Sequence, residues 1–137
     1  MENKLNIFTM KDLKGYTLEI WLSTTNNYLY CIEIKDIIGT PVFKCNIHYD
    51  YLMHILFNDI PALYEYGEPF MENITINSTM NTISVYGCDN ENEDILIIFE
   101  ETSIFQNKSS KIVELTFNGE YIYNTLQSGE LIEKMDI

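Results

Sequence analysis

The chain has 137 residues and a formal net charge of −13, because 21 Asp and Glu stand against eight basic residues, all of them Lys. A hydrophobic content of 46% with 13% aromatic residues is typical of a folded chain and excludes a disordered polyanion. So negative a protein is repelled by nucleic acid and anionic membranes, and its length predicts a single domain over residues 1–137.

The first part of the chain has the pattern of three antiparallel strands. Residues 15–23 alternate apolar and polar side chains with period 2, which predicts a half-buried strand. A second strand is expected at 28–35, and the turn at 36–40 predicts a hairpin onto a third strand at 41–48.

Cysteine use argues against a disulfide framework or a zinc site, because the chain has three Cys and no close pair among them. If the hairpin around 36–40 is symmetric, Cys31 lies opposite Cys45. In a cytoplasmic protein we expect these two residues to be small apolar fillers instead of a disulfide.

A helix is expected after the third strand. Residues 50–58 change to the apolar spacing i, i+3, i+4 that is typical of a helix. Pro61 pushes the residue before it out of the helical region, so this helix is expected to end near Asn58. Asp59 can then cap a short second turn that runs to Tyr66.

The rest of the chain predicts more strands. Residues 72–78 and 81–87 have the pattern of a hairpin, residues 94–101 that of an apolar-centred strand, and residues 111–117 that of another strand. Beyond Gly119 the apolar spacing is partly helical, but Gly129 interrupts it, so the pattern does not decide the secondary structure of this tail. The expected fold is therefore α+β, with one antiparallel sheet of six or seven strands and one or two helices packed on it. Its expected core residues are Leu18, Ile20, Leu22, Ile32, Ile34, Ile97, Phe99, Val113 and Leu115.

No residue pattern predicts catalysis, a cofactor or a metal. His48 and His54 are six residues apart, so they do not share a helix face, and the six Gly are too scattered for a phosphate loop. Cys88 stands among acids that raise the pKa of its thiol. The run from Asp89 to Asp94 imitates a calcium loop, but its sixth position is Asp94 where such loops need Gly. We therefore expect no enzyme activity and no metal dependence.

The distribution of charge is the most informative feature of the chain. Between Lys44 and Lys108 there is no Lys or Arg, and this segment holds eleven carboxylates. Acids two apart on an extended chain point the same way about 6.5–7 Å apart, a repeat similar to that of phosphates along a nucleic-acid strand. Such a row suits a groove lined by Lys and Arg. The residues predicted to bind a partner are Glu65, Tyr66, Glu68, Glu72, Asp89, Glu91, Glu93, Asp94, Glu100 and Glu101.

Tyrosine is the second unusual feature, because eight of the ten fall in Tyr-x-Tyr pairs. Most of these suit half-buried strands. The segment 64–68 is the exception, because Tyr and Glu alternate there beside a chain reversal, a mixture that favours recognition of a basic protein surface.

These observations predict a non-enzymatic acidic inhibitor that blocks the nucleic-acid groove of a basic protein. The chain is rich in Ile, Asn, Lys and Tyr and lacks Arg, a bias expected of an AT-rich genome. In size, acidity and this bias it is similar to phage-encoded anti-CRISPR and anti-restriction proteins, although it shares no motif with a specific family. One alternative is an immunity protein that neutralises a toxin such as a nuclease. Another is a small ligand-binding or enzymatic domain, which a deep pocket with convergent polar groups would favour. A third alternative is that the acidic surface binds no partner and only confers solubility.

The sequence also predicts a location and a control. It has no apolar run of signal-peptide length and none approaching the about 18 residues of a membrane helix, which favours the cytoplasm. Glu2 and Asp12 belong to the N-terminal flank, where basic and acidic residues balance, so changing them is expected to do little to association with a partner.

Overall fold

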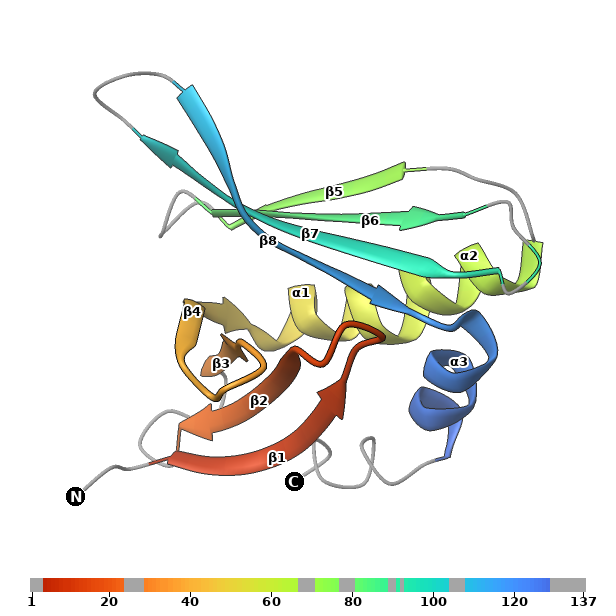
Figure 1. The fold of residues 1–137 in the computed structure, drawn as a ribbon, viewed down its shortest axis with the longest axis horizontal. Coiled ribbons are helices and arrows are strands. Elements are labelled where there is room, and N and C mark those ends of the chain that lie inside the picture. Colours follow the sequence, from red (N-terminus) through yellow and green to blue (C-terminus); the bar gives the residue numbers. More distant parts are fainter. Residues whose placement is uncertain are drawn as a thin grey trace.

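The computed structural model describes residues 4–23, 29–66, 71–76, 81–88, 91, 93–103 and 108–128. Of residues 66, 71–76, 102–103 and 108–112 only the backbone is described. Eight strands form two antiparallel four-stranded sheets, and a long helical segment lies between them (Figure 1).

Both sheets are meanders, in which each strand pairs with the next one along the chain. The first sheet contains β1 (Lys4–Lys11), β2 (Thr17–Ser23), β3 (Leu29–Lys35) and β4 (Pro41–His48). The second contains β5 (Met71–Ile76), β6 (Asn81–Gly87), β7 (Ile95–Ser103) and β8 (Lys108–Phe117). Each meander is followed by helix, so the chain runs twice through the order of four strands and a helical segment.

The α+β class is thus confirmed, whereas the single sheet of six or seven strands is wrong. Hairpin patterns specify which neighbours pair locally, but they do not say whether β4 pairs with β5. Here the helical segment separates those two strands and starts a second sheet. Strand β1 was not anticipated; its pairing with β2 is interrupted by a register shift between Asn6 and Phe8, which breaks the period-2 signal.

The helical segment is continuous through Pro61, so the expected break before this proline is wrong. It consists of α1 (Tyr49–His54), the π-turn η1 (Ile55–Asp59) and α2 (Ile60–Tyr66). Ile60, directly before the proline, has helical dihedrals of φ −64° and ψ −48°. A π-turn is wider than an α-turn, and we attribute the tolerance of Pro61 to it, because a wider turn relieves the clash of the ring with the preceding carbonyl.

His54 precedes this π-turn, and its side chain contacts two residues at the end of the turn. Its Nε2 lies 3.1 Å from Oδ1 of the buried Asp59, and its Nδ1 lies 3.2 Å from the Asn58 amide nitrogen. A buried carboxylate needs such partners to offset its lost hydration. These contacts give His54 a place in the structure of the helical segment.

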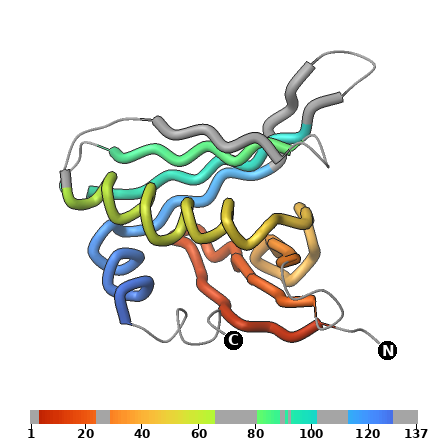
Figure 2. Tube along the Cα trace, turned by 180° about the vertical axis from the view of Figure 1, so that it is seen from behind, coloured from red at the N-terminus to blue at the C-terminus, as the bar shows by residue number. Residues whose placement is uncertain are grey.

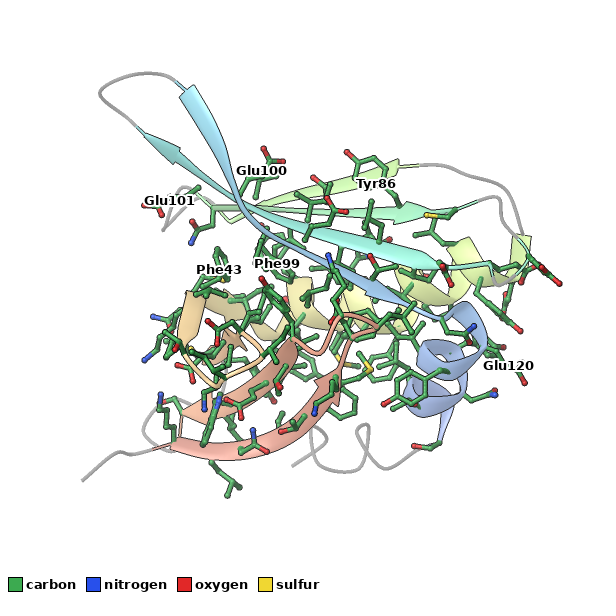
Figure 3. All side chains as sticks on the ribbon, viewed as in Figure 1. Phe43, Tyr86, Phe99, Glu100, Glu101 and Glu120 are labelled. Carbon is green, nitrogen blue, oxygen red and sulfur yellow. The ribbon has the colours of Figure 1, made fainter. Side chains whose placement is uncertain are left out.

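The core lies where the helical segment meets both sheets (Figure 2). All nine side chains predicted to be in the core are buried. The sheets also touch directly, because the rings of Phe43 on β4 and Phe99 on β7 have centroids 5.1 Å apart (Figure 3). A residual apolar gap of about 20 Å³ remains between Leu18, Leu52 and Ile83, among other apolar side chains.

Asp12 ties the two sheets together, so it is not the simple surface acid that a control for charge changes requires. Its side chain is 6% exposed. Oδ1 accepts hydrogen bonds from the backbone N–H of Lys14 and Tyr16, each at 2.9 Å, and Oδ2 accepts one from Thr116 of β8 at 3.0 Å. The Leu13 N–H donates in turn to the Thr116 carbonyl. The carboxylate of Asp12 therefore stabilises the fold through these three hydrogen bonds.

Cys31 and Cys45 do not face each other, because the register differs by one residue from the symmetric hairpin. Cys31 lies opposite Asn46, and Cys45 lies opposite Ile32, after a register shift beside Ile34. A slip of one residue moves a side chain to the other face of a sheet, so the two thiols lie on different faces. Both are buried and free, and burial raises the pKa of Cys45 to about 12. They are fillers, as predicted.

Within the described part of the chain, no helix combines the length and the apolar character that crossing a membrane requires.

Candidate functional site

The predicted partner-binding residues are not collected on one surface. Glu65 is near the end of α2, and Glu91, Glu93 and Asp94 belong to the loop that precedes β7. Helix α3 (Gly119–Gln127) contacts both α2 and this loop, and these contacts bring them to the same end of the molecule. The side chains of the remaining candidates Tyr66, Glu68, Glu72 and Asp89 lie outside the described residues.

Glu100 and Glu101 lie further along β7, away from the other acids. Six residues separate Glu100 from Asp94, which corresponds to about 20 Å along an extended strand. Figure 3 shows Glu100 and Glu101 at one end of the molecule and Glu120, the second residue of α3, at the other.

The start of α3 is held in place by a side-chain cap. Asn118 precedes the helix, and its Oδ1 accepts a hydrogen bond from the backbone N–H of Tyr121 at 3.0 Å. Ile122 and Leu126 bury the apolar stripe of the helix. Consequently Glu120 and Tyr121, which is 48% exposed, are presented to solvent.

Gly119 lets α3 approach the other two elements closely. A Cβ atom at this position would overlap the carbonyl oxygen of Glu93 and lie 2.9 Å from Cδ1 of Tyr64. Only glycine leaves room for this approach. The absence of one side chain therefore brings α2, the loop before β7 and α3 together.

Two tyrosines fasten α2 to α3. The rings of Tyr64 and Tyr123 are stacked, with centroids 4.6 Å apart and an interplanar angle of 27°. The Tyr123 hydroxyl donates a hydrogen bond of 3.0 Å to Oε1 of Glu65. This hydrogen bond to Glu65, together with the negative charge of that residue, raises the pKa of Tyr123. Glu65 is thus positioned and remains exposed.

The loop before β7 is folded back on itself. The Cys88 N–H donates to the Asp94 carbonyl at 2.8 Å, Glu91 lies in a turn, and Glu93 has a left-handed φ of 49°. The expected extended, phosphate-like row is therefore wrong for Glu91 and Glu93. Both are nevertheless exposed, so the loop presents their carboxylates from a turn.

We call this region the acidic end. It comprises Glu65, Glu91, Glu93, Asp94 and Glu120 with Tyr64, Tyr121 and Tyr123. Every lysine whose side chain is described lies between residues 4 and 44, in a strand of the first sheet or in the turn between β1 and β2. Within the described residues, Glu65, Glu91, Glu93 and Glu120 form no ion pair with any of these lysines. Within the described part of the chain, the acidic end therefore gathers four exposed carboxylates, Glu65, Glu91, Glu93 and Glu120, without a lysine among them.

Sequence reasoning identified four of these acids but not the contribution of α3. The signals for that helix were present, because Asn118 is a favourable N-cap and Ile122 and Leu126 have i, i+4 spacing. What no local pattern revealed was that Glu120 and Tyr121 would stand beside Glu93.

Among the residues that the structure describes, no three His, Cys, Asp or Glu side chains are grouped so that they could hold a metal ion. No protein-family model, curated protein or solved structure matches the chain.

Replacing Gly119 by Ala is expected to lower the free energy of unfolding by about 2 kcal/mol, because the added Cβ overlaps backbone that has to shift. Chemical denaturation measures this change. Backbone NMR signals of Glu93 and Tyr64 should move as well, since these residues border the new methyl group.

Gly39→Ala is the matched control. Gly39 has a φ of +92° with nothing within 4 Å of the added Cβ, so its replacement strains a turn and leaves the acidic end unchanged. If Gly119→Ala instead stabilises the protein, as Ala does in an unobstructed helix, the close approach at Gly119 is refuted.

Proposed function

We propose that this chain is a non-enzymatic inhibitor that binds a basic, nucleic-acid-binding protein through its acidic end and blocks the nucleic-acid groove of that partner. The supporting observation is that close packing at Gly119 brings together the three elements that carry five acids, α2, the loop before β7 and α3, at the end where Tyr121 is exposed. Repulsion among these charges costs stability, so their convergence calls for a compensating role.

The chemistry of the acidic end matches a surface rich in Lys and Arg. Carboxylates accept charge-assisted hydrogen bonds from such side chains, and their combined field accelerates encounter with a positive partner. Tyr121 adds a large rigid ring with a polar tip, a residue type that contributes strongly to protein interfaces.

The acidic end also has the stiffness that a binding surface needs. The Asn118 cap, the stacked Tyr64 and Tyr123 rings and the hydrogen bond to Glu65 hold its elements before any partner arrives. Preorganisation of this kind reduces the entropy that is lost on binding.

A groove that binds phosphates offers the same donors to carboxylates, so nucleic acid and the acidic end compete for it. This mode of action is that of anti-CRISPR and anti-restriction inhibitors carried by phages and mobile elements, the class we favour. An immunity protein that neutralises a nuclease toxin would use the same surface and is the alternative.

The test is capture of the partner from bacterial lysate on the immobilised protein at low salt, followed by elution with rising salt and identification by mass spectrometry. We expect a basic nucleic-acid-binding protein that leaves the column as screening increases. Added DNA or RNA should displace it, because both occupy one groove.

A captured protein that binds nucleic acid and this chain at the same time contradicts the groove-blocking proposal. Retention that does not depend on salt contradicts the acidic end as the binding surface. Capture of a nuclease toxin whose gene lies beside that of this chain establishes the immunity alternative.

A further inference from the structure

A second site lies in the first sheet, on the face that points away from the core. Trp21 on β2, Cys31 on β3 and Asn46 on β4 are direct cross-strand neighbours, so their side chains share this face. They line an open pocket of about 330 Å³, which lies within the size range of small-molecule sites. Its remaining lining residues are Lys4, Ser23, Leu29, Tyr30 and Lys44.

This pocket is positive in an otherwise negative protein. Lys4 and Lys44 line it from the two edge strands of the sheet, and none of its lining residues is a carboxylate. Burial raises the pKa of the Cys31 thiol, whereas the charges of Lys44 and Lys4 lower it. The charges of both lysines therefore add to a positive potential at Cys31, which lines the same pocket.

Two acids on this face of the sheet, Glu19 and Glu33, form ion pairs with Lys35. Lys35 Nζ lies 3.1 Å from Glu19 Oε1 and 3.6 Å from Glu33 Oε1. Glu33 lies opposite Lys44 in the strand register, and its charge raises the pKa of Cys31. However, Glu33 is ion-paired with Lys35. Within the described residues, neither Lys4 nor Lys44 forms an ion pair.

Trp21 contributes an aromatic surface and an unused donor. The Lys4 ammonium lies 5.2 Å from the centre of its ring. The indole N–H is buried and has no acceptor among the described residues. A buried donor without a partner is costly, and an acceptor brought by a ligand would remove that cost.

We propose that this pocket binds a small aromatic phosphate of the nucleoside-monophosphate class. The phosphate, which carries close to two negative charges, matches the two ammonium groups. The aromatic ring contacts Trp21, as bases do on exposed aromatic side chains. The pocket is larger than a bare inorganic anion requires. The acidic end does not prevent this binding, because salt screens distant charges within about 10 Å at 0.1 M.

Trp21 is the only tryptophan of the chain, so it reports on the pocket without labelling. The experiment titrates the full chain with adenosine 5′-monophosphate and follows the single indole N–H signal by NMR. We expect a saturable shift of this signal. Adenosine, which lacks the phosphate, and inorganic phosphate, which lacks the ring, should each bind at least about tenfold more weakly, since each loses one of the two sets of contacts.

The double variant Lys4→Gln, Lys44→Gln should weaken binding of adenosine 5′-monophosphate by about tenfold or more. Lys11→Gln is the matched control, because Lys11 is exposed on β1 and does not line the pocket. The proposal is overturned if the indole signal does not move at millimolar nucleotide. It is also overturned if adenosine or phosphate binds as tightly as the nucleotide, or if Lys11→Gln weakens binding as much as the double variant.

Discussion

Asp12→Ala is expected to lower the free energy of unfolding by about 4.5 kcal/mol, since hydrogen bonds to a charged group contribute at least about 1.5 kcal/mol each and three are lost. One of them, from Thr116, joins the β1–β2 turn to the second sheet, so the variant loosens the contact between the sheets as well as the turn. Urea denaturation measures the effect.

Asp36→Ala is the control for this prediction. Asp36 accepts hydrogen bonds from the N–H groups of Ile38 and Thr40, but these belong to its own hairpin turn. Because they are exposed, water replaces them, and we expect a loss of about 1 kcal/mol. Equal losses for Asp12→Ala and Asp36→Ala would show that the bond to Thr116 contributes nothing.

Glu93→Lys combined with Glu120→Lys is expected to slow association with the partner captured from lysate by at least about tenfold at low salt, because the steering field changes sign locally. Dissociation should change less. Since both residues are exposed, the free energy of unfolding should move by under about 1 kcal/mol for the pair. Stopped-flow or surface-based kinetics at several salt concentrations measures the association rate.

Glu100→Lys combined with Glu101→Lys changes the net charge by the same amount at the far part of β7. If the acidic end is the binding surface, this control associates nearly as fast as the unmodified protein. If both double variants slow association equally, net charge alone drives the encounter. If neither does, the acidity serves solubility, and the interface has to be sought elsewhere.

The sequence by itself determined the local elements and the core. Period-2 alternation, turn signals and apolar runs together located seven of the eight strands, and the nine side chains expected to be buried are buried. Such patterns are informative because a strand or helix exposes one face to water, so periodicity records burial directly. The acidic character of residues 45–107 was equally visible, since charge is a property of composition.

Only the tertiary structure decided how these parts are assembled. It divided the strands between two sheets, carried the helix through Pro61, and assigned Asp12 to a bridge between the sheets. Each of these outcomes depends on contacts between residues far apart in the chain, on which local periodicity is silent.

The candidate sites divide in the same way. The sequence supplied Glu65, Glu91 and Glu93, but their association with Glu120 depends on the room that Gly119 leaves for α3. The pocket around Trp21 arises from the register of four strands, which brings lysines from both edges of the sheet to one face. A surface is made by residues that packing brings together, and packing is decided by the whole chain at once.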